Sequence, residues 1–202
     1  MKLLDALQEI VEGIGPVRKA WFTTFNLNID LIESYIAPVL MGTDFPKAPD
    51  EFESLQQQLF PVDGEPPIDI RVFYDIRTPP RDKIKKTSIP LYGVDFRSPR
   101  LTQREKKLFR EGFFHPKVIY LSGDGGEFIG TGSANLTIDG WGKNRECFTF
   151  QKLHGRSNRS DVYSFFKRIT DGVTLLVRVT PGGKRQCKSS DFDTTRIEFE
   201  TM

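Results

Sequence analysis

Two short segments of the sequence each hold a pair of polar residues separated by one position: His115 and Lys117, then Ser133 and Asn135. On a strand, residues two apart project to the same face, so a hairpin between the pairs can bring all four side chains to one end of adjacent strands. An imidazole serves as a nucleophile or as an acid and base at neutral pH. A lysine ammonium neutralises a phosphate oxygen, and serine and asparagine donate further hydrogen bonds to it. The four residues therefore indicate chemistry on a phosphate group.

The order and spacing of these residues resemble the HKD motif of the phospholipase D superfamily, H-x-K-x4-D-x6-G-S-x-N. The local match covers residues 113–150. The sequence departs from the motif in two places. Ser122 stands where the motif has aspartate, with Asp124 two residues later, and Gly132 lies three residues beyond the position that the motif spacing gives for its glycine. A longer turn over residues 122–126 explains both departures.

The resemblance implies a catalytic site made of His115, Lys117, Ser133 and Asn135. Glu146 is expected to join them, because related nucleases carry an Asn-x-Glu pair whose carboxylate holds the catalytic imidazole. The alternative for Glu146 is an ordinary strand carboxylate.

The resemblance also implies a two-step, in-line mechanism that uses no metal ion. One histidine attacks phosphorus to give a phosphohistidine, a second histidine protonates the leaving oxygen, and water hydrolyses the intermediate. Two motifs are needed, and this sequence has one, since its only other histidine, His154, lacks a lysine two positions on. We expect a homodimer in which His115 of each subunit meets across a two-fold axis, forming one composite site. The alternative is a longer natural protein whose second motif lies past Met202.

The net charge of +2 conceals an uneven distribution along the chain. Residues 1–76 carry a net −8, residues 77–117 a net +8 and residues 118–202 a net +2. A basic block between less basic segments is typical of a polyanion site, whereas the alternative is a solvated loop and helix. We expect the nucleic-acid contacts to come from Arg77, Arg81, Lys83, Lys85 and Lys86.

The motif indicates the bond that is cleaved but leaves the substrate open. DNA is favoured because the basic block runs directly into His115, so the sequence predicts a nuclease. Similar domains occur in bacterial restriction and phage-defence systems, and this role is expected by analogy alone. One alternative is a lipid-cleaving enzyme of the phospholipase D type, although no membrane-docking element is found beyond the N-terminal helix. The other is a module that binds nucleic acid without cutting it, and the intact polar set argues against it.

Helix-like and strand-like segments alternate along the chain and must position these residues. Apolar residues at helical spacing predict helices over residues 2–14, 28–40, 50–59, 102–111 and 161–170. Aromatic and β-branched runs predict strands over 19–25, 68–74, 91–96, 116–121, 127–131, 146–150 and 172–179. This alternation predicts an α/β fold with a mixed β-sheet sandwiched between helices, which is also phospholipase D-like. We expect residues 1–180 to form the catalytic domain, residues 181–202 a C-terminal extension or the start of a further segment, and residues 77–90 an exposed basic loop.

The composition argues against a membrane, exported or metal-dependent protein. Hydrophobic residues make up 38% and charged residues 28%, and no apolar stretch approaches the roughly 20 residues of a membrane span. With two cysteines and no export signal, the sequence predicts a cytoplasmic protein without a structural disulfide, in which Cys147 is a buried thiol. Two histidines and two cysteines leave no expected metal site or cofactor, and the acidic run over residues 50–53 lacks the strand context of a metal nuclease. His154 is expected in a surface loop.

Overall fold

A single mixed sheet organises the chain in the computed structural model, which describes residues 3–61, 67–78, 87, 89–94, 104, 113–172, 176–180 and 183–187. The sheet has eight strands in the order β6-β5-β4-β1-β2-β3-β7-β8. β1 (Val17–Thr24), β2 (Asp69–Asp75) and β3 (Leu91–Val94) are parallel neighbours. The other pairings are antiparallel, and they involve β4 (Val118–Gly123), β5 (Gly126–Gly132), β6 (Phe148–Lys152), β7 (Leu176–Thr180) and β8 (Gly183–Cys187). The predicted mixed α/β sheet is therefore confirmed.

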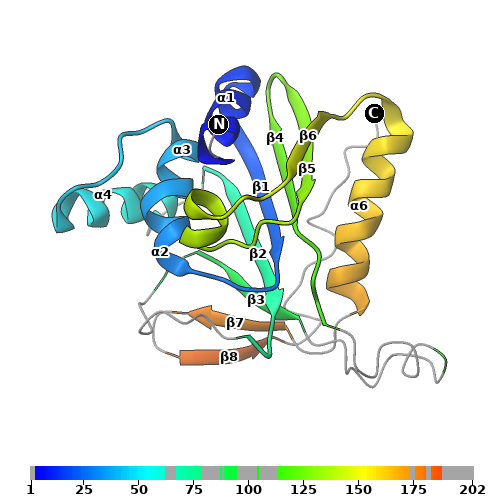
Figure 1. The fold of residues 1–202 in the computed structure, drawn as a ribbon. Helices are drawn as coiled ribbons and strands as arrows, with labels where there is room; N and C mark the ends of the chain where they lie inside the picture. The colour runs from blue at the N-terminus through cyan, green and yellow to red at the C-terminus, as the bar shows by residue number, and fades with distance from the viewer. Residues whose placement is uncertain are drawn as a thin grey trace.

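Helices cover both faces of this sheet (Figure 1). One face carries α1 (Leu3–Ile14), α4 (Pro49–Leu59) and a continuous helix made of α2 (Ile29–Leu31), a π-helical turn (Ile32–Ile36) and α3 (Ala37–Met41). A second π-helical turn (Asp139–Lys143) packs its Trp141 into the same core. The other face is covered by α6 (Gly155–Gly172), which starts earlier than the predicted helix over 161–170.

Alternation along the central strands explains why both faces are buried. In β1, Phe22 points into the core shared with α1 and α3, while Trp21 points into the core shared with α6. In β2, Val72 and Phe73 divide between the same two cores in the same way. Strands buried on both faces read as continuous apolar runs, which is the pattern that these segments show in the sequence.

Two predictions about exposure are wrong, the first of them only in part. Thr87 and Ile89, at the end of the predicted exposed loop over 77–90, are each 1% exposed, because the chain there enters the core as it approaches β3, while residues 79–86 lie outside the described residues. Cys147 is exposed rather than buried, since it precedes β6, and β6 is an edge strand of the sheet.

The predicted helix over 102–111 lies outside the described residues except for position 104. β8, which follows the predicted domain boundary at residue 180, pairs with β7 at the other edge.

The topology brings five strand ends together. β1, β2 and β5 finish at the same end of the sheet at which β4 and β6 begin, because β4 is antiparallel to both β1 and β5. This is the lower end of the sheet in Figure 1. All five residues predicted for the catalytic site flank these strand ends, so the fold gathers them from distant parts of the sequence.

Candidate active site

His115 and Lys117 lie directly before β4 rather than on it. Pro116 separates them and has no N–H to give to a strand ladder, so regular pairing starts at Val118. Thr23 of β1 fixes this junction, since its hydroxyl oxygen accepts a hydrogen bond of 2.8 Å from the Val118 N–H. The predicted strand over 116–121 is thus slightly too long at its start, but the two side chains still share one face.

The Lys117 ammonium contacts the imidazole of His115. Its Nζ lies 2.8 Å from Nδ1 and 3.3 Å from Nε2 of the ring, and 3.2 Å from the His115 carbonyl oxygen. An ammonium can only donate, so the ring nitrogen that accepts from it is unprotonated and the imidazole is neutral in this arrangement. Lys117 is 7% exposed while His115 is exposed, which leaves the imidazole accessible in front of a buried cation.

Burial and charge favour the neutral imidazole. Desolvation lowers the pKa of His115 below its ordinary value of 6.5, and the Lys117 charge lowers it further, while the Asp75 carboxylate acts in the opposite direction. Burial likewise lowers the pKa of Lys117, and the nearby Glu146 carboxylate partly offsets that effect. A neutral imidazole carries the lone pair that a nucleophile needs at neutral pH.

Ser133 and Glu146 form one hydrogen-bonded unit between β5 and β6. The Ser133 hydroxyl donates to the Glu146 carboxylate at 2.5 Å and accepts from the Cys147 N–H at 3.0 Å. Gly132 allows this close approach, because a Cβ atom at that position would lie 2.3 Å from the Cys147 carbonyl oxygen. The Glu146 carboxylate therefore holds Ser133, and it makes no hydrogen bond to His115 within the described part of the chain.

Asn135 joins the end of β5 to the end of β1. Its side-chain carbonyl accepts from the Phe25 and Asn26 N–H groups at 3.3 and 3.2 Å, and from the Thr24 hydroxyl at 3.4 Å. The Thr24 hydroxyl oxygen also accepts from the Leu136 N–H at 3.0 Å, so both loops are held together. Because the carbonyl of Asn135 is occupied by these donors, its amide N–H groups are the part of the side chain that can serve a phosphate oxygen.

Asp75, which no sequence motif singled out, anchors the segment that carries His115. Its side chain is buried at the end of β2 and accepts from the Phe114 N–H at 2.7 Å. It also accepts from the Arg77 N–H and Nε, each at 2.9 Å, and from Nη2 at 2.7 Å. Burial raises the pKa of Asp75, but the hydrogen bonds from Arg77 and Phe114 outweigh it, so the net pKa is lowered. The sequence signal that could have indicated this role is a carboxylate at the end of an apolar strand, two residues before an arginine.

Aromatic rings lie beside the imidazole. The Phe25 ring is 4.7 Å from the His115 ring and 5.6 Å from the Phe113 ring, between ring centroids. The Arg77 guanidinium lies over Phe113 at 4.2 Å from its centroid. The structure thus places Arg77, one of the five predicted nucleic-acid contacts, close to the site. The other four, Arg81, Lys83, Lys85 and Lys86, lie outside the described residues.

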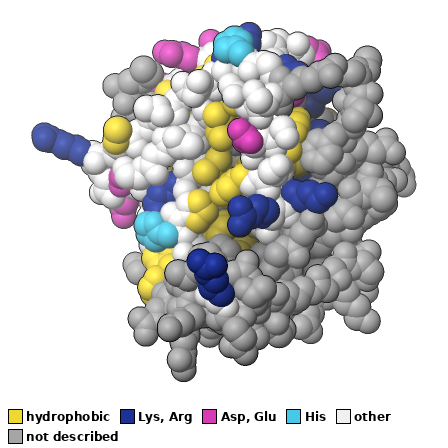
Figure 2. All heavy atoms as spheres, turned by 90° about the vertical axis from the view of Figure 1, so that its right-hand side faces the viewer, with side chains coloured by type: hydrophobic (Ala, Val, Ile, Leu, Met, Phe, Trp, Pro, Cys, Tyr) yellow, Lys and Arg dark blue, Asp and Glu magenta, His cyan; other side chains and the backbone are white. Residues whose placement is uncertain are grey.

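A hollow of about 490 Å³ opens beside Asn135. Asn26, Ile138, Lys143 and Asn144 are among its lining residues, so it joins the loops that follow β1 and β5. Figure 2 shows the face of the molecule that carries α6, on which acidic and basic side chains are interspersed and Lys and Arg side chains lie in both the upper and the lower part of the view.

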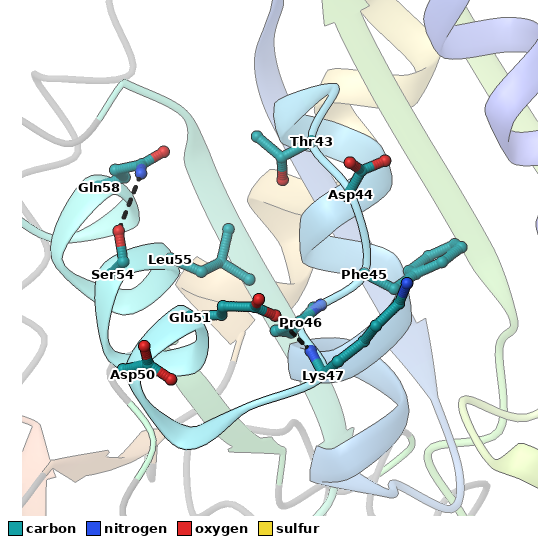
Figure 3. Close-up of a pocket in the computed structure, with 10 residues that line it drawn as sticks. All are labelled: Thr43, Asp44, Phe45, Pro46, Lys47, Asp50, Glu51, Ser54, Leu55 and Gln58. Carbon is teal, nitrogen blue, oxygen red and sulfur yellow. Dashed lines mark hydrogen bonds between the residues drawn. The ribbon is translucent and has the colours of Figure 1, made fainter.

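A second hollow, of about 390 Å³, lies between α4 and the loop before it (Figure 3). It contains Asp50 and Glu51 from the acidic run but none of the predicted site residues. The Glu51 carboxylate accepts from the Lys47 and Ala48 N–H groups, which is the ordinary capping of a helix start.

Within the described ranges, no three His, Cys, Asp or Glu side chains gather as a metal site, and no helix is long and apolar enough to cross a membrane.

The second histidine lies far from this site. His154 is exposed directly before α6, as expected of a surface residue, and the preceding Leu153 N–H donates to the Glu127 carbonyl. Glu127 is near the start of β5, whereas Gly132 at its end adjoins the site. Five residues of strand span about 17 Å at about 3.4 Å per residue, so His154 cannot reach a phosphate held at His115.

Comparison with known proteins gives similarities of fold. No protein-family model matches the chain, and no curated protein matches it. The structure is similar to that of Nuc from Salmonella typhimurium, a phospholipase D family member, with a TM-score of 0.45 and 12% sequence identity over 91% of this chain and 90% of Nuc. It is also similar to NucT from Helicobacter pylori, with a TM-score of 0.43 and 15% identity over 84% of this chain and 89% of NucT.

Proposed function

We propose that this chain is a metal-independent phosphodiesterase, a nuclease that cleaves DNA through a phosphohistidine formed on His115. The observation that carries the proposal is the contact between the exposed His115 imidazole and the buried Lys117 ammonium, at the sheet end where Ser133 and Asn135 also lie. This arrangement supplies a neutral nucleophile and a fixed cation from protein groups alone.

The first step forms a bond between phosphorus and a ring nitrogen of His115 as the bond to the leaving oxygen breaks. When phosphate binds, the Lys117 ammonium transfers its hydrogen bond from the imidazole to a phosphate oxygen, which frees the nitrogen lone pair for attack. The Asn135 amide donates to the same phosphate. In the second step water attacks phosphorus, the imidazole leaves, and the proton of the water passes to the group that acted as acid.

The acid for the leaving oxygen is His115 of a second copy of the chain. His154 is too distant to serve, and the sequence contains no third histidine. A symmetric dimer would bring a second imidazole to the phosphate on the side opposite the nucleophile. The Ser133–Glu146 pair lies at the same end of the sheet and is available to orient that imidazole. By analogy with similar bacterial domains, the role we propose is restriction or phage defence.

The experiment that tests the chemistry is cleavage of plasmid and single-stranded DNA by the purified chain in excess EDTA. We expect cleavage to persist, to be abolished in His115→Ala, and to be retained in His154→Ala, which is the matched control because it removes the other histidine. Activity that disappears in EDTA and returns with Mg²⁺ would refute the mechanism.

Subunit exchange tests the shared site. In mixtures of wild-type and His115→Ala protein, the remaining activity should be proportional to the square of the wild-type fraction, because a mixed dimer lacks either its nucleophile or its acid. A linear loss would show that each chain works alone.

A further inference from the structure

Phe113 is the most exposed of the large hydrophobic residues that the structure describes. It is 58% exposed, compared with 42% for Tyr35 and Ile138 and 41% for Phe45. Exposing a large apolar ring to water is unfavourable, and a single exposed ring has no significance by its exposure alone. The position of Phe113, two residues before His115, makes its surroundings informative.

The ring is held in place although it is exposed. The Arg77 guanidinium lies 4.2 Å from its centroid, and the Phe25 ring meets it edge to face at an interplanar angle of 86°. Arg77 is itself fixed by two side-chain hydrogen bonds to the buried Asp75 carboxylate, at 2.9 and 2.7 Å. An aromatic surface held by its neighbours loses little conformational entropy when a ligand stacks on it.

The ring is connected to the imidazole through one intervening ring. Phe25 contacts both Phe113 and the His115 imidazole, so the three rings form a continuous row that ends at the nucleophile. A phosphate bound at His115 therefore places its neighbouring sugar and base over this row.

We propose that Phe113, supported by Arg77, is a stacking platform for the base of a nucleotide adjacent to the scissile phosphate. This inference rests on the proposed nuclease function and specifies its substrate as an unpaired strand. Aromatic side chains stack on any base, and arginine adds a cation–π contribution. In a duplex both faces of each base are covered by its neighbours, so only an unpaired or extruded base can occupy the platform.

The test compares two single-stranded substrates of equal length in EDTA: an oligothymidylate, and an oligonucleotide in which tetrahydrofuran replaces every base. We expect Phe113→Ala to lower kcat/KM on the oligothymidylate about tenfold, the fold-change of a lost base–aromatic stack worth about 1.4 kcal/mol. On the abasic substrate the same substitution should change kcat/KM by less than about twofold. Phe113→Trp should retain the wild-type preference for the base-containing substrate. Phe45→Ala, which removes an exposed phenylalanine elsewhere, should change neither rate.

The outcomes separate this inference from the function on which it depends. If wild-type protein cleaves no DNA at all, plasmid included, the proposed function fails; if it cleaves plasmid but neither single-stranded substrate, the function stands and the platform is refuted. If Phe113→Ala slows both substrates equally, or weakens self-association in sedimentation while both rates fall together, the ring is a structural or subunit contact and the platform is refuted. Equal rates of wild-type cleavage on the base-containing and abasic substrates would also refute it.

Discussion

Replacing Asp75 with asparagine removes one charge from the buried network behind His115. Each carboxylate oxygen of Asp75 accepts two hydrogen bonds, one pair from the Arg77 N–H and Nε and the other from Arg77 Nη2 and the Phe114 N–H. An asparagine keeps one acceptor oxygen, and its amide nitrogen must then face two donors in either orientation. The substitution therefore loses two hydrogen bonds and removes the carboxylate charge that faces the Arg77 guanidinium.

The size of the effect follows from burial. Removing one partner of a buried ion pair costs about 3–5 kcal/mol, and Arg77 retains 26% side-chain exposure, which places the expected loss at about 3 kcal/mol. Asp69 and Arg71, at the opposite end of the same strand, provide the matched control. Their carboxylate and guanidinium are 2.8 Å apart and 34% and 20% exposed, and the other Asp69 oxygen accepts from the Trp21 indole N–H at 3.0 Å. Asp69→Asn keeps one of these two hydrogen bonds and should cost about 1 kcal/mol.

Urea denaturation at neutral pH measures both variants. The deficit of Asp75→Asn should also shrink in acid, since the lowered pKa of Asp75 means that its stabilisation is present above the ordinary aspartate value of 3.8 and is lost as pH falls through the lower folded value. Asp75→Asn and Asp69→Asn losing equal stability, or a deficit that is independent of pH down to pH 3, would refute the anchoring role assigned to Asp75.

Three further predictions concern the site. In His154→Ala, where His115 is the only imidazole, NMR should give a pKa for His115 below 6.5, and adding Lys117→Met should raise it, because the Lys117 charge disfavours the imidazolium; a value above 6.5 would contradict the neutral nucleophile. Gly132→Ala should cost about 2 kcal/mol or more and impair cleavage, because its Cβ would overlap the Cys147 carbonyl, whereas Gly142→Ala has no atom within 4 Å of the new Cβ and should be mild in urea denaturation. If Arg81, Lys83, Lys85 and Lys86 contact phosphates, the dependence of log affinity for duplex DNA on log salt should have a slope of about −0.9 per phosphate, and neutralising them should flatten it; an unchanged slope would make this segment a solvated surface.

The sequence predicted the local features of the fold and site better than the contacts between them. Aromatic and β-branched runs located β1 and β2, and the spacing of His115, Lys117, Ser133 and Asn135 indicated one sheet end, because these signals are short-range. The hydrogen bond between the Glu146 carboxylate and Ser133 was not predicted, and the expected role of Glu146 in holding an imidazole stays a prediction.

The roles of Asp75, Phe25 and Phe113 could not be predicted, because they depend on which strands are neighbours. Asp75 and Phe114 are far apart in sequence, and only the order of strands in the sheet brings the carboxylate to the segment that carries His115. Cys147 illustrates the same limit: an apolar run looks buried in sequence, but the edge position of β6 exposes the residue before it.

The stereochemical course at phosphorus tests the central claim that His115 is a covalent nucleophile. An oligonucleotide with one stereodefined phosphorothioate at the cleaved linkage would be digested in ¹⁸O-water containing EDTA, and the configuration of the product determined. Each in-line displacement inverts phosphorus, so attack by His115 followed by attack by water predicts net retention. Net inversion would show that water attacks the phosphodiester directly and would contradict the phosphohistidine.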